Sequence, residues 1–116
     1  MASPEIEDYR FGRIQVDGNI YRRDVIIKPD GVVEDWWRAK GHQLALGDLA
    51  VALETEPEVL VIGQGSFSQM KVPTETIQHL QRAGMEVIVE NTGAACSTYN
   101  RLRQQRRVVA ALHLSC

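Results

Sequence analysis

The residues best suited to hold a ligand form the segment Gly63-Gln64-Gly65-Ser66-Phe67-Ser68. It follows the apolar run at residues 59–62, and in open α/β sheets ligands bind beyond the carboxyl ends of parallel strands. Backbone N–H groups in such a turn hold an anion or a carbonyl oxygen when they face it. Lys71 lies close enough in sequence to supply a countercharge, although an ordinary surface lysine is the simpler explanation. For the segment itself, the alternative is a turn that needs glycine only for its backbone angles.

Two further polar residues follow apolar runs and would reach the same edge of the sheet. Asn91 comes after the run at residues 85–89, and His113 lies at the end of the run that begins at Val108. Histidine changes charge near neutral pH, so His113 is the best-placed candidate for acid–base chemistry; a histidine satisfied within the core is the alternative. The predicted ligand-binding residues are Gly63, Gly65, Ser66, Lys71, Asn91 and His113.

No known catalytic or cofactor motif is complete. Ser68 holds the position of the third glycine of a dinucleotide fingerprint, and G-Q-G-S-F-S does not match the nucleophile pattern G-x-S-x-G. The three histidines have no partner at metal-binding spacing. We expect Cys96 to be buried filler, and nothing in the sequence makes Cys116 reactive. The sequence therefore predicts no catalytic residues, no cofactor and no metal site, and leaves open whether any catalysis occurs.

Trp36 and Trp37 are adjacent, so in an extended segment their side chains point to opposite faces. We expect one of them to pack in the core and the other to be exposed. An exposed tryptophan indicates a contact surface. These two residues are therefore the predicted interaction surface.

The first third of the chain predicts strands. Short apolar runs at residues 11–16 and 20–27 flank Asp17-Gly18, a hairpin signal, and Pro29-Asp30-Gly31 is a strong turn. Residues 32–37 continue as an extended segment.

The rest of the chain alternates between helical and strand patterns. Leu46, Leu49, Ala50 and Leu53 lie on one helical face, and Thr74 is the expected N-cap of a second helix that Gly84 ends. A third helix opens at residues 91–93, and apolar strands run at residues 59–62, 85–89 and 108–112. Such alternation predicts parallel pairing with right-handed crossovers.

These elements predict an α/β fold with three layers: a central, mostly parallel mixed sheet, crossover helices and an N-terminal β-hairpin. We expect residues 1–8 to be a flexible N-terminus and residues 9–116 to be one domain.

Composition narrows the classes of function. The 116 residues are 44% hydrophobic and 24% charged, with a net charge of −2. The negative net charge disfavours nucleic-acid binding, and only the arginines at residues 101–107 support it. No apolar run approaches the roughly 20 residues that span a bilayer. The acidic N-terminus predicts that there is no targeting signal. The low number of cysteines fits a reducing compartment, so we expect a cytoplasmic location.

Several short motifs together resemble the Mth-domain family of unknown function, and they cover residues 9–116. The family includes the adipogenesis-associated Mth-domain protein and the mitochondrial NADH:ubiquinone oxidoreductase complex assembly factor 3. The resemblance implies a three-layer α/β fold and a pocket around Gly63, Gly65, Lys71 and Pro73, but no catalytic mechanism. Family members often have glycine where Ser68 stands, which weakens a phosphate-binding interpretation. The motifs are Gly31-Val32-Val33-Glu34-Asp35-Trp36-Trp37, Gly41-His42, Asp48-Leu49, Val59-Leu60-Val61-Ile62-Gly63-Gln64-Gly65, Met70-Lys71-Val72-Pro73, Tyr99-Asn100 and Ala110-Ala111-Leu112-His113-Leu114-Ser115-Cys116.

Two functions follow. The first is a non-catalytic protein-binding or assembly module that acts on an unidentified protein partner or forms a homodimer, with no role at a membrane. The second is a small-molecule or anion-binding protein, or an undiscovered enzyme, that uses the 63–68 loop. The missing catalytic constellation and the tryptophan pair favour the first.

Overall fold

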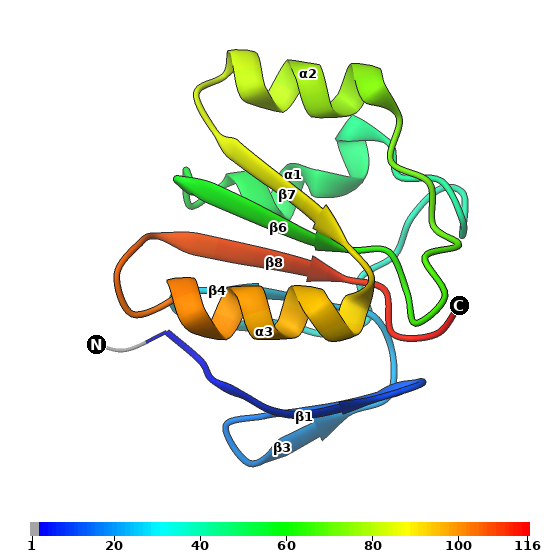
Figure 1. Ribbon diagram of the computed structural model, residues 1–116, viewed down its shortest axis with the longest axis vertical. Helices are drawn as coiled ribbons and strands as arrows, with labels where there is room; N and C mark the ends of the chain where they lie inside the picture. Colours follow the sequence, from blue (N-terminus) through cyan, green and yellow to red (C-terminus); the bar gives the residue numbers. More distant parts are fainter. Residues whose placement is uncertain (1–2) are drawn as a thin grey trace.

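The computed structural model describes residues 3–116, which form two sheets and the helices that cover them (Figure 1). The first sheet is antiparallel and has the strand order β1-β2-β3. Asp17 and Gly18 both adopt positive φ at the turn between β2 and β3, which confirms the expected hairpin. The strands are β1 (Ile6–Arg10), β2 (Arg13–Val16) and β3 (Asn19–Tyr21).

Strand β1 begins inside the segment that was expected to be flexible. Ile6 is only 6% exposed, and the side chain of Asn100 bonds to both its N–H and its carbonyl oxygen. The Tyr99 hydroxyl donates to the carbonyl oxygen of Pro4. A strand therefore begins at Ile6, within the segment expected to be flexible, because a later helix supplies partners that the local sequence does not reveal. Met1 and Ala2 lie outside the described residues.

The main sheet is mixed, as expected, and has the order β5-β4-β8-β6-β7. Strands β6, β7 and β8 pair in parallel, whereas β4 pairs antiparallel with both β8 and β5. The extended segment expected at residues 32–37 ends as a strand at Val33. The strands are β4 (Val25–Lys28), β5 (Gly31–Val33), β6 (Val59–Gly63), β7 (Glu86–Glu90) and β8 (Val108–Leu112).

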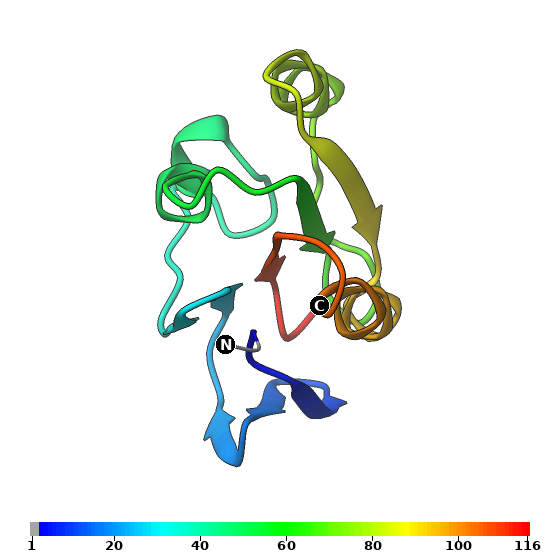
Figure 2. The same ribbon diagram turned by 90° about the vertical axis from the view of Figure 1, so that its left-hand side faces the viewer.

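Two buried clusters cover the two faces of the main sheet and produce the three layers (Figure 2). One cluster joins Val59 and Val61 to α3 and the small sheet, and the other joins Leu60 and Ile62 to the remaining helices. Strand β6 is buried on both faces, as its unbroken apolar run predicts. The helices are the 3₁₀ turn η1 (Leu46–Leu49), α1 (Ala50–Leu53), α2 (Thr74–Arg82) and α3 (Thr92–Leu102).

Two of the three helix boundaries predicted from the sequence agree with the structure. Asn91 caps α3 by accepting from the N–H of Ala94, and Gly84 follows α2 with a φ of +96°. The prediction that Thr74 caps α2 is wrong: the N-cap is Pro73, with no side-chain hydrogen bond, and Thr74 is the first helical residue. Proline fits this boundary because its fixed φ suits the start of a helix.

Across residues 3–116, no helix combines the length and the apolar character that crossing a membrane requires.

Candidate functional site

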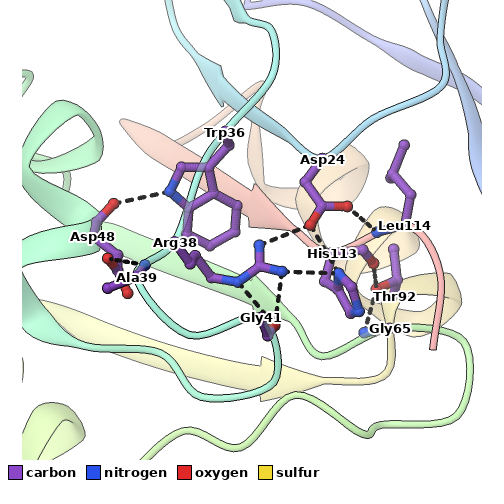
Figure 3. Close-up of polar contacts among 10 residues, drawn as sticks. All are labelled: Asp24, Trp36, Arg38, Ala39, Gly41, Asp48, Gly65, Thr92, His113 and Leu114. Carbon is purple, nitrogen blue, oxygen red and sulfur yellow. Dashed lines mark hydrogen bonds and ion pairs between the residues drawn. The ribbon is translucent and has the colours of Figure 1, made fainter.

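A buried polar network lies where β4 begins and β8 ends, beside the predicted ligand loop (Figure 3). Arg38 Nη1 donates to Asp24 Oδ2 at 2.7 Å, and His113 Nδ1 lies 2.8 Å from the same oxygen. The second carboxylate oxygen, Oδ1, accepts the backbone N–H of Leu114 at 2.8 Å. The antiparallel pairing of β4 with β8 brings these distant residues together.

The carboxylate determines the tautomer of His113. An ionised carboxylate only accepts, so Nδ1 carries the proton and donates it to Asp24. Arg38 Nη2 lies 3.1 Å from the same Nδ1, and this approach is packing, because two donors cannot bond. In the neutral ring, Nε2 is then an acceptor; it is buried and has no hydrogen-bond partner among the described residues. An Asp–His pair of this kind orients a general base, but a base also needs a substrate within reach.

Arg38 is held from three sides. Its Nη2 and Nε donate to the carbonyl oxygen of Gly41 at 2.9 and 3.2 Å. Its guanidinium lies 4.8 Å from the centre of the Trp36 ring, a cation–π distance. The Trp36 Nε1–H donates to the carbonyl oxygen of Asp48 at 2.8 Å. Trp36 is thus a buried support for the network.

The network holds Asp24 in its ionised form. Burial by itself raises the pKa of Asp24, but hydrogen bonds from His113, Leu114 and Arg38 outweigh burial and hold the pKa below its usual value. A buried arginine and an ionised aspartate at 2.7 Å form a compensated pair. The charges of Asp24 and Arg38 therefore balance each other inside the protein.

Most amides of the 63–68 loop are hydrogen-bonded within the protein. The N–H of Gly65 donates to Thr92 Oγ1, and that of Ser66 donates to the carbonyl oxygen of Ser115. Thr92 Oγ1 donates in turn to the carbonyl oxygen of His113 at 2.5 Å. The N–H groups of Gln64, Ser68 and Gln69 also have backbone acceptors. These amides are not available to an anion in this conformation.

Both glycines of the loop allow a close approach. A Cβ on Gly63 would lie 2.8 Å from Thr92 Oγ1, and one on Gly65 would lie 2.3 Å from the carbonyl carbon of Cys116. Gly65 also has a φ of +101°, which favours glycine. Protein atoms therefore fill the space that each missing side chain leaves.

The structure brings four of the six predicted ligand-binding residues together: Gly63, Gly65, Ser66 and His113 share Thr92 or the 114–116 segment as neighbours. The Ser66 hydroxyl bonds to the hydroxyl of Tyr9. Asn91 serves as the helix cap. Lys71 is exposed, and its backbone pairs with the segment around His42 and Leu44.

The two tryptophans divide as expected. Trp36 is 8% exposed and Trp37 is 76% exposed. Trp37 borders a hollow of about 300 Å³ whose apolar lining includes Val33, Ala50 and Val51. Trp37 is thus exposed beside an apolar hollow, whereas Trp36 is buried; that either residue belongs to an interaction surface stays a prediction.

Sequence reasoning missed a second aromatic surface and most of the polar network. Phe11 and Phe67 are 55% and 69% exposed, with ring centres 6.0 Å apart. Their signal was two phenylalanines in turns rich in glycine and serine. The sequence signal for Asp24 and Arg38 was weaker, since each is only a charged residue beside an apolar or aromatic run.

Cys96 and two arginines of the 101–107 cluster have roles within the fold that need no ligand. Cys96 is buried, and burial raises the pKa of its thiol to about 12, so it is not a reactive thiolate. Arg103 and Arg106 form ion pairs with Glu5 and Glu86. Among residues 3–116, no group of three or more potential ligands could hold a metal ion.

Known proteins resemble this chain over most of its length. It is 27% identical over 113 residues to the NADH dehydrogenase (ubiquinone) 1 alpha subcomplex assembly factor 3 of Danio rerio, which covers 95% of this chain and 63% of that protein. The chain thus spans less than two thirds of that relative. A protein named 13 kDa major membrane protein, from Francisella tularensis, is 29% identical, covering 91% of this chain and 86% of that protein.

Solved structures share the fold. A crystal structure of a Bordetella parapertussis protein is 32% identical with a TM-score of 0.79, covering 99% of this chain and 98% of that one. A solution structure from Bordetella pertussis, described as an Mth938-like domain, has 24% identity and a TM-score of 0.67, covering 96% and 85%. The family described as a protein of unknown function (DUF498/DUF598) matches residues 6–113. The protein therefore belongs to this family, which the motifs had indicated as the Mth-domain family.

Proposed function

We propose that this protein is a non-catalytic protein-binding module, of the assembly-factor kind, that docks a protein partner through Trp37. The observation that carries the proposal is the exposure of this indole beside an apolar hollow. Tryptophan is enriched among the few residues that dominate binding energy at interfaces. A side chain of this size, left in water by its own fold, is suited to insert into a partner.

The surroundings of Trp37 support a rigid docking surface. Trp36 directly precedes it and is fixed by its hydrogen bond to Asp48 and by the guanidinium of Arg38. The backbone on which Trp37 stands therefore does not need to be ordered on binding, which lowers the entropic cost of association. The name of the assembly-factor relative supports the same class of function. Two unpaired cysteines support action in a reducing, cytoplasm-like compartment.

The test compares two single variants by affinity capture from an extract of the source cell with quantitative mass spectrometry. Trp37→Ala removes the proposed anchor, and Phe67→Ala removes a similarly exposed aromatic elsewhere. We expect both variants to keep the thermal stability of the wild type. A protein retained by the wild type and by Phe67→Ala, but lost with Trp37→Ala, supports the proposal. Identical retention by all three chains rules out Trp37 as the anchor. Sedimentation of the purified wild type shows whether the partner is a second copy.

A second candidate is a small-molecule site at Gly63, Gly65, Ser66 and His113. One observation favours it: His113 Nε2 is a buried acceptor without a partner among the described residues. The bonded loop amides count against it. A thermal-shift screen with a metabolite and anion panel tests this candidate, since a ligand at about 100 times its Kd adds about 2.7 kcal/mol of stability. A shift that His113→Asn abolishes supports the site, and a flat panel favours the protein-binding function.

A further inference from the structure

The outer edge of the main sheet is an open strand. β7 lies at one end of the strand order and, within residues 3–116, pairs only with β6; no helix or strand lies beyond it in Figure 2. The N–H of Glu86 bonds to Glu58, and the carbonyl oxygen of Glu90 bonds to Gln64, so the backbones of both face β6. Alternation along the strand then turns the N–H and C=O groups of Val87 and Val89 away from the sheet.

The other edge strands of this protein are shorter or covered in part. β3 and β5 have three residues each. At β1, the side chain of Asn100 accepts from the N–H of Ile6 and donates to its carbonyl oxygen. For Val87 and Val89, no side chain in residues 3–116 makes such a bond. Natural proteins protect exposed edges, so one left open over five residues is an opportunity for pairing.

The sequence of β7 disfavours pairing with a second copy. Glu86-Val87-Ile88-Val89-Glu90 reads the same in both directions. Two copies paired antiparallel about Ile88 would bond Val87 to Val89 and would place Glu86 opposite Glu90 twice. Like charges directly opposite destabilise a strand pair. A shift by two residues would instead place a glutamate opposite Ile88, which removes an apolar contact.

The same two glutamates specify a different partner. Ile88 packs with the core on the α3 face, whereas Val87 and Val89 pack on the α2 face, so Glu86 and Glu90 lie on the α3 face with Ile88. The carboxylate of Glu86 is paired with Arg106 at 2.9 Å, whereas among the described residues the carboxylate of Glu90 accepts only from the neutral hydroxyl of Thr98. The edge therefore presents three apolar residues between two carboxylates, and the carboxylate of Glu90 gives it a net negative charge.

We propose that β7 docks an extended segment of a partner protein, which pairs antiparallel with it and carries Lys or Arg at the two positions opposite Glu86 and Glu90. Backbone bonds to Val87 and Val89 provide the affinity of strand addition, and the two charge pairs provide its register and specificity. This edge is distinct from the Trp37 surface, so either proposal can fail alone.

The test uses cyclised hairpin peptides, because a preformed strand avoids the cost of ordering a free peptide. The outer strand of one hairpin reads Thr-Lys-Val-Thr-Val-Lys-Thr, and a matched hairpin has Glu in place of both Lys. A third carries N-methyl groups on the bonding edge of the Lys strand. Binding to the ¹⁵N-labelled full chain is followed by NMR at the amides of Val87 and Val89.

We expect the Lys hairpin to shift and protect both amides, with the Glu hairpin about tenfold weaker. The N-methylated hairpin should not bind. The double variant Glu86→Lys/Glu90→Lys should reverse the preference, and its thermal midpoint checks its fold. The proposal is overturned if Val87 and Val89 do not respond to millimolar Lys hairpin, or if charge reversal does not change their response. A wild-type homodimer with protected β7 amides also overturns it.

Discussion

Asp24 is the residue on which the buried polar network depends, because its carboxylate is the shared acceptor for Arg38, His113 and the backbone of Leu114. Asp24→Asn keeps the shape but removes the charge, and it leaves the Arg38 guanidinium buried without a counterion. Removing one partner of a buried pair costs about 3–5 kcal/mol. We expect this loss in the free energy of unfolding, measured with urea. Asp8→Asn, at a more exposed pair with Arg13, should cost less than about 1 kcal/mol.

The lowered pKa of Asp24 also predicts how stability depends on pH. Burial raises the pKa of Asp24, but the hydrogen bonds from His113, Leu114 and Arg38 outweigh burial and place the pKa below its usual value. The stabilisation is therefore complete above the unfolded-state pKa and is lost as the pH falls through the lower folded-state pKa. Unfolding free energies between about pH 6 and pH 2 should fall less steeply in Asp24→Asn than in the wild type. Equal slopes would show that this carboxylate is not preferentially ionised by folding.

Gly65 is the residue that lets the 63–68 loop and the end of the chain meet. Gly65→Ala forces a side chain into a φ of +101° and against the carbonyl carbon of Cys116. The backbone strain alone costs roughly 1–3 kcal/mol, and the displaced segment adds to it. Thermal unfolding should show a clear loss of stability. In Gly47→Ala, where a Cβ meets nothing within 4 Å, the midpoint should change little.

At the scale of elements, two substitutions at the N-cap of α3 test whether Asn91 has a structural role. Asn91→Ala removes the acceptor for the N–H of Ala94 and should lower the free energy of unfolding by about 1 kcal/mol. Asn91→Asp keeps a capping oxygen and should retain most of the stability. A loss of stability with both variants would contradict the capping role.

The apolar patterns allowed most elements to be predicted, because burial determines both the pattern and the element. β6 is a continuous apolar run because both of its faces are covered, and Gly84 ended α2 because its backbone needs positive φ. Thr74 was misplaced because a threonine and a proline both suit a helix start. The start of β1 was missed because, besides its pairing with β2, Ile6 is held by Asn100 of α3, more than ninety residues away.

The candidate site was predictable only in the parts that follow a strand directly. Gly63, Gly65 and His113 lie at strand ends that the sequence locates, so their meeting followed from parallel pairing. Asp24 and Arg38 reach His113 only through the antiparallel pairing of β4 with β8, which no local pattern specifies. The hydrogen bonds that the loop amides make also depend on the path of residues 114–116, and this segment lies outside any helix or strand.

At the scale of the molecule, the small N-terminal sheet and the main sheet share one core, and Ile14 and Tyr99 are fully buried members of it. If this core is cooperative, Ile14→Ala should lower the opening free energy of amides in both sheets by the same amount, about 2–5 kcal/mol. Native-state hydrogen exchange at Ile14 and Val61 measures both sheets. Ile20→Ala, at an exposed position of the same small sheet, should change either value by less than about 0.5 kcal/mol. A loss confined to the N-terminal strands would mean instead that the small sheet opens as an independent unit, which its shared core with α3 argues against.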